Sequence, residues 1–287
     1  MSGRIVITGA GGLVGRVLAG QAGRQGRDVV ALTSSDWDIT EPGTGERHLA
    51  AGDIVVNCAA ITNVDLAEAV PERSRAVNAV GAGNVAHACA RVGASLIHLS
   101  TDYVFGGDST RPYDIDDEPA PLSVYGRTKL AGEHAVLAAL PDAHVVRTSW
   151  IFEGGNGADF AAVMRRAAAG SGDIEMVADQ IGSPTYVGDL CAALLQIADG
   201  GVRGPLLHAA NAGSASRFDQ AQAVFAELGA DPGRVHPISG DRHPRPAPRP
   251  SYSALAATKS TAAGLTPLRP WRAALAEALA TMGGSLL

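Results

Sequence analysis

The sequence predicts an α/β fold with a doubly wound parallel sheet, followed by a small C-terminal lobe. The first observation is the alternation of short apolar runs with amphipathic segments in the first half of the chain, the pattern of βα units. The second is a glycine-rich turn directly after the first apolar run. The third is the length of 287 residues, which suits one α/β core and a small additional lobe.

The first strand is expected at residues 4–8, and Gly9, Gly12 and Gly15 follow it. Such glycines let the backbone approach a pyrophosphate, while the N-terminus of the next helix faces the anion. An ordinary turn is the competing interpretation, because glycine is abundant in this chain. The strand before the turn and the amphipathic helix after it favour a dinucleotide site of the Rossmann type. The candidate contacts in this turn are Gly9 and Gly12.

The second strand is expected at residues 28–33, and its end is where Rossmann folds select their cofactor. A carboxylate there binds the ribose 2′-hydroxyl of NAD, whereas this chain has Thr33, Ser34 and Ser35. Neutral hydroxyls admit a 2′-phosphate without attracting it strongly. We therefore expect NADPH as the cofactor, with a weak preference and with NADH also used.

Two further segments complete the first half of the predicted sheet. A strand at residues 53–60 ends in Ala59 and Ala60, whose small side chains let a cofactor lie close to the backbone, although helix–sheet packing uses such residues too. A helix is expected at residues 71–94 with Asn78 inside it. An asparagine within a helix usually points to solvent; the alternative is that Asn78 holds a water molecule near the active site.

The chemistry of the chain is expected between a strand at residues 96–100 and a helix that begins near Tyr125. Residues four apart lie on one face of a helix, so the Lys129 ammonium is placed one turn from the Tyr125 phenol. A free tyrosine has a pKa of about 10, and an adjacent cation lowers that pKa, which makes Tyr125 a usable general acid. Thr101 is expected to hold and polarise a carbonyl oxygen. A chance Tyr-x-x-x-Lys pair is the alternative, and the glycine turn upstream disfavours it.

The second half of the chain is expected to divide between two domains. Residues 1–153 are predicted to form the dinucleotide-binding domain, to which residues 187–211 return, whereas residues 154–186 and 212–287 form mostly the substrate-binding lobe. The proline-rich segment 237–250 is interpreted either as a solvated linker or as a rigid loop that places Arg249 over an anion. Helices are expected at residues 160–169, 187–198, 217–228 and 271–282.

Composition argues against several classes of function. The formal net charge of −6 and the lack of a basic cluster give no support for a nucleic-acid or membrane-surface partner. The apolar runs are shorter than the roughly 18 residues that span a bilayer, and the glycine turn interrupts the N-terminal run, unlike a signal peptide. The three cysteines are scattered, which fits a reducing, cytoplasmic location without disulfides. The eight histidines lack metal-ligand spacing, so no metal is expected.

Seven motifs together resemble the extended short-chain dehydrogenase/reductases, and the resemblance covers nearly the whole chain. Within that family the chain is most similar to the dTDP-4-dehydrorhamnose reductases. The motifs are residues 9–15, 59–60, 100–105, 125–130, 147–150, 179–185 and 247–255.

The resemblance implies NAD(P)H-dependent reduction of the C4 keto group of a nucleoside-diphosphate 4-keto-6-deoxyhexose, a reaction of deoxysugar (rhamnose) biosynthesis. Thr101, Tyr125 and Lys129 match the catalytic residues: Tyr125 protonates the C4 oxygen as the nicotinamide delivers hydride, and Lys129 also holds the nicotinamide ribose. The cofactor contacts are Gly12, Leu13, Val14, Asp38, Ile39, Ala59, Ala60 and Thr62, with Asp38 and Ile39 at the adenine and Thr33 added from its position. The substrate contacts are Tyr103 and Trp150, joined by Thr101, Asp102 and Arg249.

Departures from the family pattern and alternative functions are also visible. Ser34 replaces a common arginine, and Val17 replaces a glutamate that some members use in a metal-bridged dimer, so a monomer or a homodimer is expected. A catalytically silent regulatory or binding subunit is the alternative of another class, which the intact catalytic residues disfavour. A 4,6-dehydratase requires Asp-Glu after the threonine, whereas Asp102 is followed by Tyr103 here. An epimerase holds NAD permanently, which the absent carboxylate after the second strand argues against.

Overall fold

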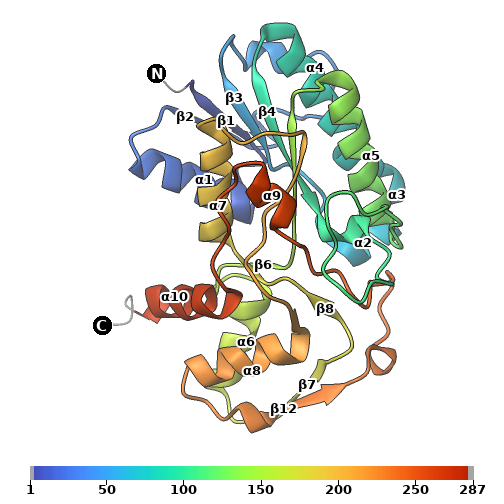
Figure 1. Cartoon of the computed structure of the whole chain (residues 1–287), viewed down its shortest axis with the longest axis vertical. Coiled ribbons are helices and arrows are strands. Elements are labelled where there is room, and N and C mark those ends of the chain that lie inside the picture. Colours follow the sequence, from blue (N-terminus) through green and yellow to red (C-terminus); the bar gives the residue numbers. More distant parts are fainter. Residues whose placement is uncertain (1–2, 284–287) are drawn as a thin grey trace.

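The computed structural model describes residues 3–283 and contains a parallel sheet with a smaller lobe beside it (Figure 1). The sheet has six strands in the order β10-β5-β4-β3-β1-β2, and every neighbouring pair is parallel. This arrangement confirms the predicted doubly wound α/β class. The strands are β1 (Ile5–Thr8), β2 (Val29–Leu32), β3 (Ile54–Asn57), β4 (Ser95–Thr101), β5 (His144–Thr148) and β10 (Leu206–His208).

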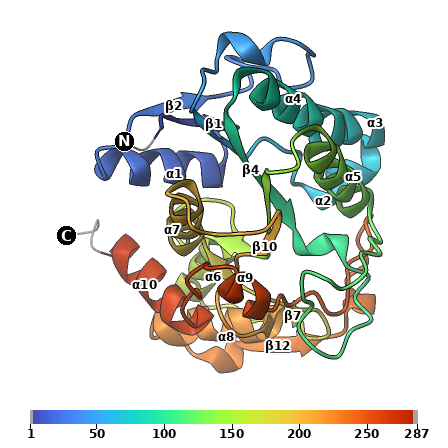
Figure 2. The ribbon, with the colours of Figure 1, turned by 45° about the horizontal axis from the view of Figure 1, so that its top comes forward.

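Helices cover both faces of the sheet (Figure 2). On one face α1 (Leu13–Arg24) and α7 (Val187–Ala198) pack on strand residues such as Ile5 and Ile7. On the other face α4 (Ala82–Val92) and α5 (Val124–Ala139) pack on the alternate residues, such as Val6. Because side chains alternate across a strand, each short apolar run contributes to both cores.

The smaller lobe lies below the sheet in the view of Figure 1 and has its own core around Phe152 and Phe225. Its helices are α6 (Phe160–Ala169), α8 (Arg217–Glu227) and α10 (Trp271–Gly283). Its two-stranded sheets are formed by β7 (Ile174–Val177) with β12 (Val235–Ile238), β8 (Ile181–Gly182) with β11 (Ala215–Ser216), and β6 (Ile151–Phe152) with β9 (Thr185–Tyr186).

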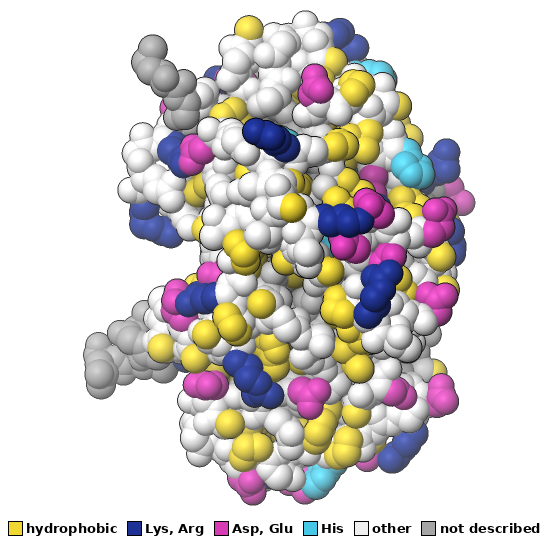
Figure 3. Space-filling model, viewed as in Figure 1, with side chains coloured by type: hydrophobic (Ala, Val, Ile, Leu, Met, Phe, Trp, Pro, Cys, Tyr) yellow, Lys and Arg dark blue, Asp and Glu magenta, His cyan; other side chains and the backbone are white. Residues whose placement is uncertain are grey.

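The remaining elements are short. They are α2 (Val64–Ala69), α3 (Pro71–Arg75), α9 (Thr258–Ala262) and the 3₁₀ turns Gly45–Arg47, Asp102–Val104, Pro232–Arg234 and Gly240–Arg242. Within residues 3–283, no helix has the length and apolar character needed to cross a membrane. On the face shown in Figure 3, acidic and basic side chains are interspersed.

The helix expected at residues 71–94 is interrupted by a π-helical turn, Ala76–Gly81, between α3 and α4. Asn78 lies in this turn and is buried, so the expectation that it points to solvent is wrong. Its Oδ1 accepts a hydrogen bond from the Ile61 backbone N at 2.8 Å, and its Nδ2 donates to Thr128 Oγ1 at 3.1 Å. The turn is therefore tied both to α5 and to the loop after β3. A π-turn of this kind is often found at a functional site.

Candidate active site

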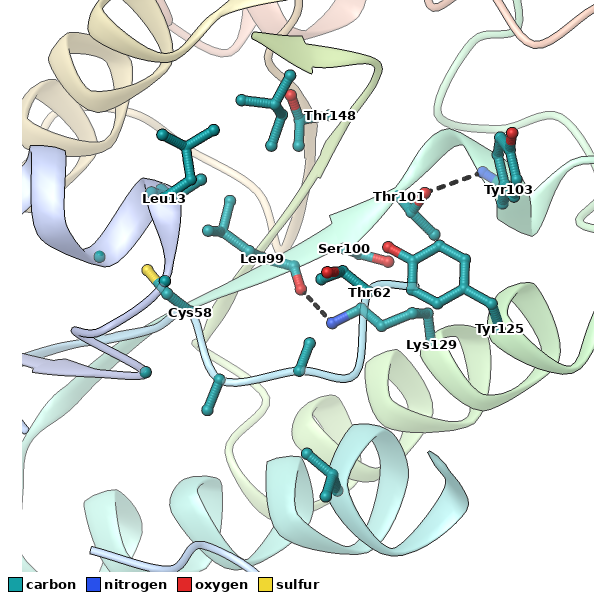
Figure 4. Close-up of a pocket in the computed structure, with 18 of the residues that line it drawn as sticks. Leu13, Cys58, Thr62, Leu99, Ser100, Thr101, Tyr103, Tyr125, Lys129 and Thr148 are labelled. Atoms are coloured by element: carbon teal, nitrogen blue, oxygen red, sulfur yellow. Dashed lines mark hydrogen bonds between the residues drawn. The ribbon is translucent and has the colours of Figure 1, made fainter. Parts of the chain in front are cut away.

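A cleft of about 680 Å³ follows the carboxyl ends of the strands and is closed on one side by the smaller lobe. Ligands of open α/β sheets bind at this edge. The cleft is lined by most of the predicted site residues, and Figure 4 shows several of them. These are Gly9, Gly12, Leu13, Val14, Thr33, Asp38, Ile39, Ala59, Ala60, Thr62, Thr101, Asp102, Tyr103, Tyr125, Lys129 and Trp150.

The glycine turn at one end of the cleft is built for close backbone approach. Gly9 has a φ of 67°, and a Cβ placed on it would lie 2.6 Å from the backbone of Ala59. A Cβ on Gly15 would lie 2.6 Å from the Gly9 carbonyl oxygen. Helix α1 begins after Gly12, whose position provides no side-chain cap for the first backbone N–H groups. These donors fit the pyrophosphate of a dinucleotide.

An exposed carboxylate, Asp36, lies four residues past the end of β2, whereas the positions directly after the strand are the neutral Thr33, Ser34 and Ser35; Asp36 does not line the cleft among the described residues. Asp36 Oδ2 accepts hydrogen bonds from the Thr33 backbone N at 2.8 Å and from Thr33 Oγ1 at 2.7 Å. These bonds lower the pKa of Asp36. The Thr33 hydroxyl proton is therefore directed to Asp36, and only Ser34 and Ser35 keep hydroxyls that could donate to a 2′-phosphate.

The catalytic candidates meet where β4 ends beside α5. Tyr125 and Lys129 project from α5 towards the end of β4, where Thr101 lies (Figure 4). Thr101 Oγ1 donates to Asp102 Oδ1 at 3.1 Å and accepts from the Tyr103 backbone N at 3.2 Å. The Lys129 Nζ donates to the Leu99 carbonyl oxygen at 2.5 Å. The sequence spacing thus brings the three side chains to one place, and their catalytic roles stay predictions.

The expected effect of Lys129 on Tyr125 is not what the structure shows. Burial raises the pKa of Tyr125 above its usual value, with Asp102 and Tyr103 acting in the same direction. Burial also lowers the pKa of Lys129 to about 8. The prediction of a lowered Tyr125 pKa is wrong for this arrangement, because the Lys129 amine bonds the Leu99 carbonyl rather than the phenol. A protonated Tyr125 is nevertheless the form that a general acid requires.

Asp102 joins three segments of the chain that are distant in sequence. Its Oδ2 accepts from Ser149 Oγ at 2.8 Å and from Ser253 Oγ at 2.6 Å, and its Oδ1 accepts from Thr101. The carboxylate is buried, and burial raises its pKa although all three hydroxyls stabilise its charged form. Asp102 thus fixes the position of Thr101 relative to the smaller lobe, and its contact with substrate stays a prediction.

Trp150 forms the wall between the catalytic residues and the smaller lobe. Its φ is 46°, in the left-handed region, and it lies in the short connection between the end of β5 at Thr148 and the start of β6 at Ile151. The indole lies against Gly182, where an added Cβ would come within 2.4 Å of the ring. Its other neighbour is the Arg217 guanidinium, whose carbon lies 3.5 Å from the ring centroid.

Comparison with known proteins identifies the family to which this chain belongs. Residues 3–283 match the model of the RmlD substrate binding domain. The chain belongs to this family.

Two relatives and a solved structure illustrate the similarity to other members of the RmlD substrate binding domain family. The chain is 64% identical to the dTDP-4-dehydrorhamnose reductase of Mycolicibacterium smegmatis, over 99% of this chain and 88% of that protein. It is 47% identical, over 96% and 94%, to a probable dTDP-4,6-dihydroxy-2-methyloxan-3-one 4-ketoreductase of Streptomyces antibioticus. The crystal structure of dTDP-4-dehydrorhamnose reductase from Bacillus anthracis in complex with NADP superimposes with a TM-score of 0.92 at 35% identity, covering 98% of this chain and 100% of that chain.

Arg217 lies in the cleft of this family member, although no sequence motif pointed to it. It is the first residue of α8 and stacks on Trp150 and, at 4.8 Å, on the Phe160 ring. Its Nη1 donates to Gln220 Oε1 at 3.2 Å. Burial lowers the pKa of Arg217 to about 10. In the described part of the chain no carboxylate forms an ion pair with it, so the guanidinium can take an anion from the cleft.

Arg249 takes a different position. Its Nη1 and Nη2 bind the two oxygens of Asp65, at 2.5 and 3.0 Å, and the Ala247 backbone N donates to the same carboxylate. The segment around Arg249 is thus fixed to α2, but Asp65 already occupies the guanidinium. Arg249 does not line the cleft among the described residues. Its predicted contact with the diphosphate stays a prediction.

Metal binding has no visible site in the described residues. No group of three or more His, Cys, Asp or Glu side chains in residues 3–283 is arranged to hold an ion. Val17 packs against the core on the α1 face of the sheet.

Proposed function

We propose that this protein is an NADPH-dependent reductase of the C4 keto group of a dTDP-linked 4-keto-6-deoxyhexose. The observation that carries the proposal is the meeting of Thr101, Tyr125 and Lys129 at the end of β4, beside a glycine turn that fits a dinucleotide. The names of the relatives support a dTDP-sugar as the substrate, and the solved structure with NADP supports the cofactor.

The residues divide the reaction among them. NADPH, when bound, supplies the hydride that adds to C4. The protonated Tyr125 transfers its proton to the C4 oxygen, which becomes a hydroxyl and leaves a tyrosinate. Lys129 stabilises that tyrosinate when it is charged. Thr101 has one proton, which points to Asp102, so it must turn to the ketone before it polarises the carbonyl.

The substrate side of the cleft supports a sugar nucleotide. Trp150 offers an apolar surface to the C5 methyl edge of a 6-deoxyhexose, and Tyr103 lies within the same wall. We propose Arg217 as the first partner of the diphosphate, because it lines the cleft, stacks on Trp150 and, among residues 3–283, forms no ion pair with a carboxylate. A guanidinium suits phosphate oxygens, since its donors form a planar fork. Arg249 would follow as a second donor only if it leaves Asp65.

The direct test is consumption of reduced cofactor. Purified protein with NADPH is given a dTDP-linked 4-keto-6-deoxyhexose, and the product is identified by NMR as the C4 alcohol. The same sugar linked to UDP, and dTDP alone, are the matched controls. We expect turnover with the dTDP-sugar and none with dTDP. Binding of NADPH without turnover of any keto sugar would instead support the alternative of a catalytically silent subunit.

Location, assembly and domain boundaries are part of the same proposal. We propose a cytoplasmic enzyme, supported by three cysteines that are all free. We propose a monomer or a homodimer, and sedimentation velocity distinguishes the two. We also propose that residues 1–153 with 187–211 form the dinucleotide domain, because α7 and β10 pack with the six-stranded sheet. The last residues of the first range, β6, cross into the core of the smaller lobe.

A further inference from the structure

A buried chain of polar side chains runs behind the cleft from β1 to α5. Its members are Thr8, Asn57, His98 and Lys129, and none is more than 3% exposed. They come from three neighbouring strands and one helix. A buried polar chain is stable only when each donor faces an acceptor, so its hydrogen-bond directions can be worked out.

The directions begin at Asn57. Its Oδ1 lies 3.2 Å from the Ala59 backbone N and 2.7 Å from Thr8 Oγ1. A backbone N–H can only donate, so the atom facing it must be the amide oxygen. The Asn57 Nδ2 is then a donor, and it lies 3.0 Å from His98 Nδ1. His98 Nδ1 is therefore an acceptor without a proton.

The proton of neutral His98 is consequently on Nε2. Burial lowers the pKa of His98 well below its usual value, so the ring is neutral. Its Nε2 lies 3.4 Å from Lys129 Nζ. A charged Lys129 has only donors and would meet this N–H proton to proton. An uncharged amine has a lone pair that accepts from His98 while one of its own protons is donated to the Leu99 carbonyl.

We propose that His98 is a positioning residue of this reductase, which presents an N–H donor to Lys129 and thereby favours the uncharged form of the amine. This inference rests on the proposed function for its catalytic meaning. His98 acts through Lys129 and does not itself line the cleft among the described residues. Asn57 contributes because its amide donates to His98 Nδ1 and thereby keeps the His98 proton on Nε2.

Two other titratable groups, Glu133 and Cys58, influence the charge of Lys129. Glu133 lies one turn along α5 and favours the charged amine, but its carboxylate is bound by Arg147 at 2.7 and 2.9 Å and by Ser100. Cys58 follows β3, and burial raises the pKa of its thiol to about 12, so it is neutral. Burial is the main cause that disfavours the charged form of Lys129. Among the described residues, His98 is the hydrogen-bonding neighbour that presents a donor to the amine.

The consequence for the reaction is a link between pH and turnover. The tyrosinate left by Tyr125 is stabilised by a charged Lys129, while His98 stabilises the uncharged amine. Turnover is therefore expected to fall on the alkaline side as Lys129 loses its proton. Weakening the His98 contact should move that fall to higher pH.

The sequence makes this measurable, because its lysines are Lys129 and Lys259. Protein labelled with ¹³C at the lysine ε-carbon gives one signal for Lys129 and one for the exposed Lys259, and NMR follows both against pH. His98→Gln can present an amide oxygen to the amine, so the Lys129 midpoint should rise by about one pH unit. His98→Asn can keep the acceptor for Asn57 and remove the donor, so a smaller rise is expected. His87→Gln, on the exposed side of α4, is the matched control.

Three results would overturn the proposal. The first is an unchanged Lys129 midpoint in folded His98→Gln. The second is a pH dependence of turnover whose alkaline fall does not follow that midpoint. The third needs no variant: ¹⁵N NMR of wild-type histidines that places the His98 proton on Nδ1. The NMR measurements use no sugar nucleotide and are therefore independent of the reductase assay. If the Lys129 midpoint shifts in His98→Gln but the assay shows no turnover, the proposed function and the positioning role both fail. The assignment of the His98 proton to Nε2 would still hold.

Discussion

The cofactor half and the substrate half of the cleft are built in different ways. The cofactor half uses residues 9–62, and much of its surface is backbone exposed by glycine and alanine. The substrate half combines the ends of β4 and β5 with residues near 182 and 217, which are far apart in the chain. The cofactor half depends on the absence of side chains, whereas the substrate half depends on side chains supplied by several segments.

The two halves of the cleft should also respond differently to substitution. Around the glycine turn a substitution meets fixed backbone, which cannot move aside. Around Trp150 and Arg217 the contacts are between side chains, whose loss removes an interaction but leaves the backbone in place. We therefore expect substitutions in the two halves to separate cofactor affinity from substrate affinity, while loss of the Tyr125 hydroxyl, at the junction of the halves, lowers turnover.

The largest effect is expected at the junction. Tyr125→Phe removes the acid and should lower kcat by about 10²–10⁴-fold, the usual value of a general acid. NADPH affinity, measured by fluorescence titration, should stay within about threefold, a small change in free energy. Turnover at the wild-type rate would exclude Tyr125 as the proton donor.

The next effect tests the backbone of the cofactor half. Gly9→Ala places a Cβ 2.6 Å from Ala59 at a φ of 67°, and we expect NADPH affinity to fall by roughly 100-fold through strain and displacement. Gly43→Ala is the matched control, because Gly43 has a φ of 73° but no atom within 4 Å of the added Cβ. Equal losses in the two variants would mean that close approach at Gly9 is unimportant.

The substrate half is tested by its two arginines. Arg217→Gln should raise KM for the sugar nucleotide by roughly 10- to 50-fold, as expected for charged hydrogen bonds, and leave NADPH affinity unchanged. Arg249→Gln should raise KM less, because Asp65 already binds that guanidinium. If Arg249→Gln has the greater effect, the diphosphate site lies at Asp65 and α2.

The smallest effect concerns the choice of cofactor. Both reduced cofactors should work, with NADPH somewhat preferred, and a preference for NADH beyond about 100-fold would exceed what neutral hydroxyls explain. Asp36→Asn removes a negative charge that repels a 2′-phosphate, so the ratio of kcat/KM for NADPH to kcat/KM for NADH should rise by about fivefold. The expected change is small because an exposed charge is screened by salt. The shift should shrink at high ionic strength, and a shift towards NADH would contradict a repulsive role for Asp36.

Features that depend on neighbours in the chain could be predicted from the sequence. Hydrophobic periodicity predicted the parallel sheet and gave the helices at residues 160–169 and 187–198 with the bounds that the structure shows. The glycine turn and the Tyr-x-x-x-Lys pair were likewise recognisable, because their geometry is set within a few residues.

The packing of segments that are distant in the sequence sets which polar groups meet. Asp65 binds Arg249 across 184 residues, His98 lies behind Lys129, and Arg217 reaches the cleft from the start of α8. The Lys129 amine turned to a carbonyl rather than to Tyr125 for the same reason. Hydrogen bonds and burial between distant segments follow from how the lobe and the sheet pack, and no local pattern encodes that packing.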